Sequence, residues 1–139
     1  MSQELITSFK AAHQTILISL QEVQSFSRSY THVKPKIRDL HAQVLVHFER
    51  QGKGFYQQLS HFYSEDREAS KMLEFLVHDF KEIKIKYLIF YDRHSGEMAD
   101  VNARSFPKDF MEFVDALIAR IKIEQEYLFP LLNKFSQQH

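Results

Sequence analysis

Residues 110–131 read FMEFVDALIARIKIEQEYLFPL, and the spacing of their side chains decides the fold class. One set of residues recurs at steps of three and four, which is the spacing of a single helix face. The set comprises Phe110, Phe113, Leu117, Arg120, Glu124, Tyr127 and Leu131. The segment is therefore predicted to be a helix whose core-facing side carries two charged residues.

Three other segments repeat this spacing. In the first segment the repeat is Ile6, Phe9, His13, Ile16, Leu20 and Val23. In the second it is Ile37, Leu40, Val44, His47, Gln51 and Gly54, followed by Phe55, Leu59 and Phe62. In the third it is Leu73, Leu76, Phe80, Ile83, Tyr87 and Phe90. Together the patterns predict an all-α, up-down-up-down four-helix bundle forming one domain, residues 1–139. Its four helices are expected over about 3–29, 35–62, 67–94 and 107–136.

Proline and glycine predict where these helices begin, weaken and end. Pro35 and Pro107 suit the first turn of a helix, where the missing N–H costs nothing. Gly52 and Gly54 are expected to weaken the middle of the second helix. Pro130 is expected to loosen or end the fourth, because its ring clashes with the carbonyl four residues earlier.

The composition excludes several classes of protein. The 139 residues carry 18 Lys and Arg against 18 Asp and Glu, which argues against a protein that binds nucleic acid mainly by neutralising phosphates. There is no cysteine, so a disulfide scaffold, an iron–sulfur cluster and a thiol nucleophile are excluded. The sequence MSQELITSF lacks the features of a secretion signal, and no apolar run is long enough to span a membrane. A cytoplasmic protein that binds neither membrane nor nucleic acid is expected.

Five polar residues share the core-facing sides of three helices. In antiparallel helices of similar length, residues near the midpoints lie at the same level. This places the polar residues in one slab of the bundle: His13, His47, Gln51, Arg120 and Glu124. The sequence therefore predicts a buried polar layer to which the third helix contributes only apolar residues.

Three interpretations of this layer are open. The first is a satisfied hydrogen-bond network in which Arg120, one turn before Glu124, neutralises its charge. The second is an iron or zinc site formed by His13, His47 and Glu124, against which Arg120 competes for the carboxylate. The third is acid/base catalysis by His13 or His47, although no nucleophile accompanies them.

The histidines and lysines outside the layer show weaker patterns. His78 is predicted to face solvent, and His94 to lie at a helix end, where its charge favours the helix dipole. Lys81, Lys84 and Lys86 alternate with acidic residues and indicate a solvated helix face. Some of the 13 Phe are expected to remain exposed on a surface that binds a partner.

The layer resembles the metal site of the hemerythrin-type (HHE) cation-binding domain. His13, His47 and Glu124 match three of the six ligand positions of that family. Gln51 replaces the second-helix glutamate, Arg120 replaces the fourth-helix histidine, and the third helix supplies no ligand. The resemblance implies a degenerate hemerythrin-like bundle that holds at most one iron or zinc.

The departures are similar to a second family, the Rsd/AlgQ regulators of the primary sigma factor of bacterial RNA polymerase. The similarity lies in the stretch ALIARIKIEQ (116–125), in His13, in His47-Phe48 and in FYDR (90–93). The chain departs from the family at His41 and in having no tryptophan.

This second resemblance implies a protein without enzymatic activity or cofactor. It would bind the promoter-recognition region of the primary sigma factor and make it less available to the polymerase. Because that region is basic, acidic and aromatic surface residues are expected to form the contact. Asp92 and Arg93, near the end of the third helix, are the partner-binding positions that the resemblance suggests. The alternative is the metal-binding protein, with iron or zinc on His13, His47 and Glu124.

Overall fold

Helices form where the apolar spacing predicts them. The computed structural model describes residues 3–25, 30–52, 54–95 and 103–137, and these are helical or in short turns, without a strand. The α-helices are α1 (Gln3–Ser25), α2 (Tyr30–Arg50), α3 (Phe55–Phe62), α4 (Arg67–His94), α5 (Phe106–Ile123) and α6 (Phe129–Gln137). A 3₁₀ turn, Ala103–Ser105, precedes α5, and a π turn, Glu124–Leu128, joins α5 to α6.

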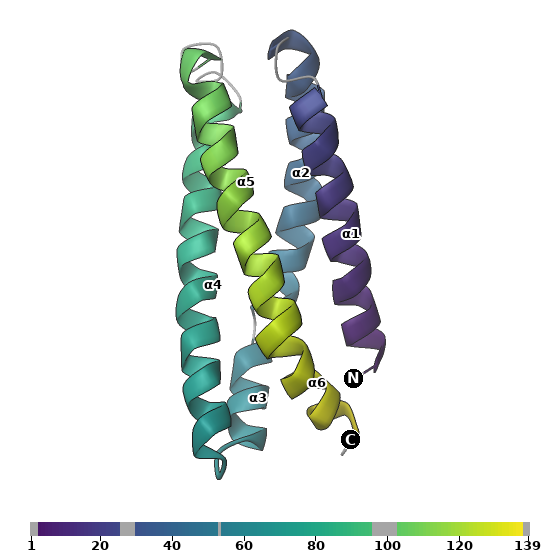
Figure 1. The fold of residues 1–139 in the computed structure, drawn as a ribbon, viewed down its shortest axis with the longest axis vertical. Coiled ribbons are helices and arrows are strands. Elements are labelled where there is room, and N and C mark those ends of the chain that lie inside the picture. Colours follow the sequence, from purple (N-terminus) through teal and green to yellow (C-terminus); the bar gives the residue numbers. More distant parts are fainter. Residues whose placement is uncertain (1–2, 26–29, 53, 96–102, 138–139) are drawn as a thin grey trace.

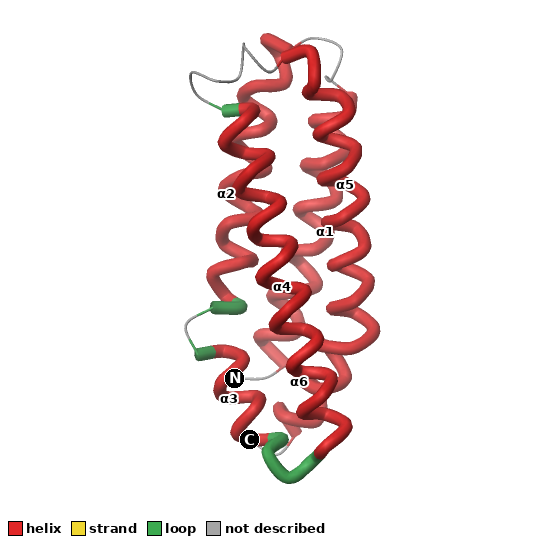
Figure 2. The backbone as a smooth tube through the Cα atoms, turned by 90° about the vertical axis from the view of Figure 1, so that its left-hand side faces the viewer, coloured by secondary structure: helices red, strands yellow, loops and turns green. Residues whose placement is uncertain are grey.

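The helices form an elongated helical bundle. α1 lies beside α2 and α4 beside α5, while α3 and α6 occupy the end where both chain termini lie (Figure 1). Successive long segments run in opposite directions along the bundle (Figure 2). At the terminal end, the Gln3 side chain donates to Asn133 Oδ1 over 3.0 Å, which fixes the start of α1 against α6. None of the described helices has the length and apolar character needed to cross a membrane.

The predicted core faces of the first and third helices are buried along their whole length. In α1 they are Ile6, Phe9, His13, Ile16, Leu20 and Val23. In α4 they are Leu73, Leu76, Phe80, Ile83, Tyr87 and Phe90. The predicted spacing is therefore confirmed for these two helices. α4 also begins as predicted, with the Asp66 side chain accepting a hydrogen bond from the Ala69 N–H over 3.1 Å.

The second predicted helix differs at its start and in its middle, whereas its predicted end at Phe62 is confirmed. It begins at Tyr30 rather than at Pro35, which lies inside α2. A proline this close to a helix start removes only one early hydrogen bond, so the helix tolerates it. The single helix predicted over 35–62 is divided, since α2 ends at Arg50 and α3 begins at Phe55. Gly54 has a φ of 88°, a left-handed conformation that glycine adopts without strain.

The fourth predicted helix changes its winding just before Pro130. The Phe129 N–H donates to the carbonyl of Glu124, five residues earlier, which defines the π turn. The wider turn accommodates the proline ring, and the expected loosening of the helix is confirmed. The π turn contains one residue more than a turn of α-helix, so the residues that face the core after it lie one position later in the sequence than predicted. Tyr127 is therefore exposed and Leu128 is buried, and the prediction for Tyr127 was wrong.

Residues 26–29, which complete the first predicted helix, lie outside the described residues.

Candidate functional site

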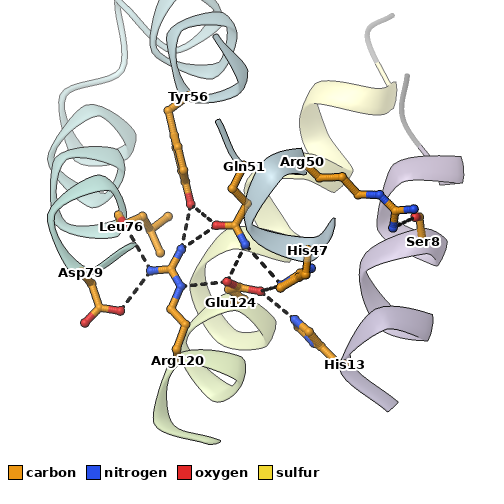
Figure 3. A network of polar contacts seen from close by, with 10 residues as sticks. All are labelled: Ser8, His13, His47, Arg50, Gln51, Tyr56, Leu76, Asp79, Arg120 and Glu124. Atoms are coloured by element: carbon orange, nitrogen blue, oxygen red, sulfur yellow. Dashed lines mark hydrogen bonds and ion pairs between the residues drawn. The ribbon is translucent and has the colours of Figure 1, made fainter. Parts of the chain in front are cut away.

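The predicted polar residues meet inside the bundle in one hydrogen-bonded layer (Figure 3). All five are buried, and they come from α1, α2, the turn directly after α2, the last turn of α5 and the first residue of the π turn. Two further residues join them, one from α3 and one from α4. The layer consists of His13, His47, Gln51, Tyr56, Asp79, Arg120 and Glu124.

Glu124 is the centre of the layer. Its Oε1 contacts His13 Nε2 at 2.6 Å and His47 Nε2 at 2.8 Å. Its Oε2 accepts from Gln51 Nε2 at 2.7 Å and from Arg120 Nε at 2.8 Å. A carboxylate offers about four lone-pair positions, so its accepting capacity is filled by the protein's own side chains.

Arg120 uses each of its guanidinium hydrogens. Nε donates to Glu124, and Nη1 donates to the Leu76 carbonyl at 3.1 Å and to Asp79 Oδ2 at 3.0 Å. Nη2 donates to Gln51 Oε1 and to the Tyr56 hydroxyl, both at 2.8 Å. Five donors therefore meet five acceptors, which is the full capacity of a guanidinium.

The hydrogen-bond pattern assigns a tautomer to both histidines. Glu124 accepts, so His13 and His47 must carry a proton on Nε2. Their Nδ1 atoms are buried and have no partner, which suits an unprotonated nitrogen better than a buried N–H. In this tautomer the 3.3 Å contact between Gln51 Nε2 and His47 Nε2 joins two donors and is not a hydrogen bond. Both imidazoles thus donate their Nε2–H to the carboxylate of Glu124.

Neighbouring groups hold the layer in a defined charge state. Burial alone would raise the pKa of Glu124, but the hydrogen bonds from His13 and His47 and the charge of Arg120 outweigh it, so this pKa lies well below its ordinary range. Burial alone would lower the pKa of Arg120, but the neighbouring Tyr56 and Glu124 raise it overall. Burial raises the pKa of the Tyr56 hydroxyl above its ordinary value. The layer therefore contains a carboxylate, a guanidinium and a neutral phenol at neutral pH.

The same atoms include a donor set that a metal could use. Ligand atoms of His13, His47 and Glu124 lie within 4.8 Å of one another. Two histidines and a carboxylate are a ligand set of zinc and iron sites. A metal-binding histidine almost always donates its second ring N–H to a partner, whereas both Nδ1 atoms here have none. The guanidinium of Arg120 already supplies the positive charge beside the carboxylate. The three side chains are therefore of the kinds that bind a metal, but the groups around them do not suit one.

His13 also borders a cavity at the surface. The cavity has a volume of about 540 Å³, lies between α1 and the α6 end of the bundle, and is lined partly by Lys10, Gln14 and Asn133. The Phe129 ring stacks on the imidazole of His13 at 5.5 Å between ring centres. Inside the bundle, the Nε2 of His13 is held by Glu124. Acid/base chemistry at His13 would first require that hydrogen bond to break.

Two members of the layer were not predicted. Tyr56 follows the α2–α3 break, where the spacing used for the prediction no longer applies. Asp79 lies beside the core position Phe80, and the prediction that the third helix adds only apolar residues was wrong. A signal existed for Asp79, because a buried arginine needs more acceptors than one glutamate supplies.

The histidines outside the layer show one further correction. His78 is exposed, as predicted, and pairs with Glu82 at 3.1 Å. His94 is the last residue of α4, as predicted, but it is buried, and its Nε2 contacts Asp109 Oδ2 at 2.8 Å. Ser105 donates to the same Asp109 oxygen over 2.9 Å. These contacts join the end of α4 to the start of α5.

The two predicted partner-binding residues lie close to this junction. Asp92 and Arg93 are both exposed. Arg93 Nη2 is 3.4 Å from Ser105 Oγ and 3.5 Å from Asp109 Oδ2. Asp92 thus remains open to a partner, whereas Arg93 already has partners within the chain.

Comparisons of the chain with protein-family models, with curated proteins and with solved structures give no match.

Proposed function

We propose that this protein is a cytoplasmic, protein-binding regulator of the anti-sigma type, similar to the Rsd/AlgQ family, on a degenerate hemerythrin-like bundle. One observation carries the proposal: the hydrogen bonds of Glu124 and Arg120 are made with each other, with other side chains of the chain and with the Leu76 carbonyl. Groups satisfied in this way stabilise a fold and have no capacity left for a substrate. The functional determinants are therefore sought on the outer surface.

An exposed aromatic pair supports this proposal. Phe75 of α4 and Tyr127 of the π turn are both exposed, and their ring centres lie 6.3 Å apart in an edge-to-face arrangement. Each is preceded in the chain by an exposed glutamate, Glu74 and Glu126. Acidic and aromatic side chains together suit a basic partner such as the promoter-recognition region of the primary sigma factor. We assign the contact to this pair and, secondarily, to Asp92.

The test is a calorimetric titration against the isolated promoter-recognition region of the primary sigma factor at low and high salt. We expect a Kd of about 10 μM or tighter that weakens as salt rises. Phe75→Ala should weaken binding about tenfold. Val46→Ala on α2 is the matched control, since Val46 is 47% exposed and Phe75 is 45% exposed. Absence of binding at about 100 μM protein would contradict the proposal.

The metal-binding alternative rests on the closeness of His13, His47 and Glu124. Elemental analysis of protein purified without added metal separates the two functions. Under the leading proposal we expect less than one iron or zinc per chain. Stoichiometric metal combined with no binding to the sigma factor region would favour the hemerythrin-like alternative.

An engineered variant sharpens this comparison. Arg120→His removes the resident cation and adds an imidazole beside Glu124, so zinc affinity should rise at least about tenfold over the wild type. Arg120→Gln is the control, because it removes the charge without adding a metal ligand. An unchanged zinc affinity in Arg120→His would mean that the guanidinium is not what opposes the metal.

A further inference from the structure

The outer face of α4 carries a group of exposed aliphatic side chains. Ile85, Leu88 and Ile89 are 58%, 45% and 56% exposed. Their spacing of three and four puts them on one side of the helix, away from the buried Tyr87 and Phe90. In Figure 2, α4 runs along the near side of the bundle with no other described helix in front of it. Grouped exposed aliphatic residues of this kind are characteristic of interaction sites.

Lysines surround this aliphatic group. Lys81, Lys84 and Lys86 are exposed and form no ion pair within the described part of the chain. The neighbouring carboxylates have other partners, since Glu82 pairs with His78 and Asp79 pairs with Arg120. Asp92 is exposed on the same side of α4, so the rim carries three lysines and one aspartate that form no ion pair with described residues, and positive charge is in excess there.

A cavity lies beside this surface, toward α5. It has a volume of about 380 Å³, and Lys86 and Ile89 form part of its α4 side. Phe90 and Phe113, both buried core residues, give it an apolar part, and the charged side chains of Arg93, Asp109 and Glu112 also line it. A cavity of this kind beside an exposed apolar face can accept one large anchoring side chain of a partner.

We infer that this face, comprising residues 81–89 and the adjoining cavity, binds an acidic amphipathic helix of a partner protein. The apolar positions of such a helix would cover Ile85 and Ile89 and place one side chain in the cavity, while its acidic positions would face the three lysines. The site is separate from the Phe75–Tyr127 pair and has the opposite charge preference. It therefore goes beyond the proposed sigma factor contact and does not depend on it.

The charge pattern argues against a parallel pair of copies of the chain as the occupant. A parallel two-fold pair of α4 helices would place each lysine beside its own copy, which brings like charges together. The sedimentation measurement described below tests an antiparallel pair.

The pattern also argues against an anionic lipid surface. Glu82 and Asp92 lie on the same side of α4 as Ile85 and are exposed, so an anionic membrane would repel them. The exposed rings that favour a membrane interface, Phe75 and Tyr127, lie elsewhere. A protein helix can leave such acidic positions at its rim.

The experiment is an NMR titration of the ¹⁵N-labelled full chain with two synthetic peptides. One is an amphipathic helix of about 18 residues with leucine on one face and glutamate elsewhere, and the other has lysine in place of glutamate. We expect the acidic peptide to shift amide signals of residues 81–93 and 109–113, with a Kd of about 100 μM or tighter that weakens severalfold between about 50 mM and about 300 mM salt. The basic peptide should leave these signals unchanged.

Two variants and one matched control complete the test. Ile85→Asp and Lys84→Glu should each weaken binding of the acidic peptide by about tenfold. Ile18→Asp on α1 should have no effect, although Ile18 is 57% exposed and thus matches Ile85. All three positions are on the surface, so thermal unfolding should report intact folds.

Four outcomes would overturn the inference. They are equal binding of both peptides, shifts outside the two ranges, binding unaffected by Ile85→Asp, and binding of phosphatidylglycerol vesicles through this face in place of the peptide. A dimer in sedimentation that Ile85→Asp dissociates would instead assign the face to a second copy. A failed sigma factor titration would bear on Phe75 and Tyr127 and leave this face unaffected.

Discussion

Arg120 Nε donates to Glu124 Oε2 over 2.8 Å from one helical turn earlier, and both side chains are closed off from water. The bond joins the last turn of α5 to the first residue of the π turn. A buried charge is tolerated only beside its partner, so the two residues stabilise the fold as a pair and not separately.

Arg120→Ala should lower the free energy of unfolding by about 3 to 5 kcal/mol, because Glu124 then stays buried without its cation. Arg120→Leu combined with Glu124→Leu should recover part of this loss, since no uncompensated charge remains between them. Recovery stays partial because the N–H groups of His13 and His47 lose their acceptor. Urea denaturation monitored by circular dichroism measures each value.

The control for this prediction is Lys108→Ala. Lys108 forms an exposed pair with Glu112 at 3.9 Å, also one turn apart, and its loss should change stability by less than about 0.5 kcal/mol. If Arg120→Ala were equally mild, the buried pair would not stabilise the protein.

Tyr56→Phe should cost about 1 to 2 kcal/mol, because the hydroxyl both donates to Gln51 Oε1 and accepts from Arg120 Nη2. Tyr127→Phe removes a hydroxyl from an exposed ring and should be nearly neutral. Thermal and urea unfolding of both variants provide the comparison. Equal stabilities would show that the Tyr56 hydroxyl adds nothing to the layer.

Stability should fall in acid because of Glu124. Its pKa in the folded protein lies below the ordinary value of 4.5, which applies to the unfolded chain. The unfolded state therefore takes up the proton first, so the stabilisation is present above about pH 4.5 and is lost as the pH falls toward the folded-state pKa. Glu124→Gln should be less stable at pH 7 and should show a flatter acid limb in plots of unfolding free energy against pH.

The control here is the exposed Glu126→Gln, which should retain the wild-type acid limb. Some slope should persist in Glu124→Gln because Asp109 acts in the same direction. Burial alone would raise the pKa of Asp109, but its hydrogen bonds with His94 and Ser105 outweigh this and lower it. An acid limb in Glu124→Gln identical to that of the wild type would contradict the prediction.

Gly54→Ala should destabilise the protein by about 1 kcal/mol, because the φ of 88° at this position is unfavourable for a residue with a Cβ. Gly52→Ala is the matched control two residues earlier. A Cβ there would lie at an ordinary 3.6 Å from the Glu49 carbonyl oxygen, so little change is expected. Similar losses in both variants would mean that the left-handed turn is not required between α2 and α3.

The sequence predicted much of the inner layer because a helix repeats its face at fixed steps. His13, His47 and Arg120 lie at such steps inside their helices, and Gln51 and Glu124 lie at the first residue after α2 and α5, where the spacing still holds. Spacing alone therefore placed them on the same helix face as large apolar residues, which predicted that they are buried.

What the spacing could not predict lies beyond an interruption or between two helices. The turn at Gly54 and the π turn each change which side of the helix faces the core, so Tyr56 was missed and Tyr127 was misplaced. The pairing of His94 with Asp109 depends on how the end of α4 meets the start of α5. No periodicity within one helix contains that information.

The layer draws its members from α1, α2, α3, α4, α5 and the π turn, which has a consequence for motion. None of these segments can swing away alone without leaving a charge or a polar hydrogen unpaired inside the protein. Local opening at this level therefore costs nearly as much as unfolding the whole chain, whereas the helix ends can fray at little cost. In hydrogen exchange, amides near Gln51, Phe80 and Arg120 should exchange together and last, as one cooperative unit.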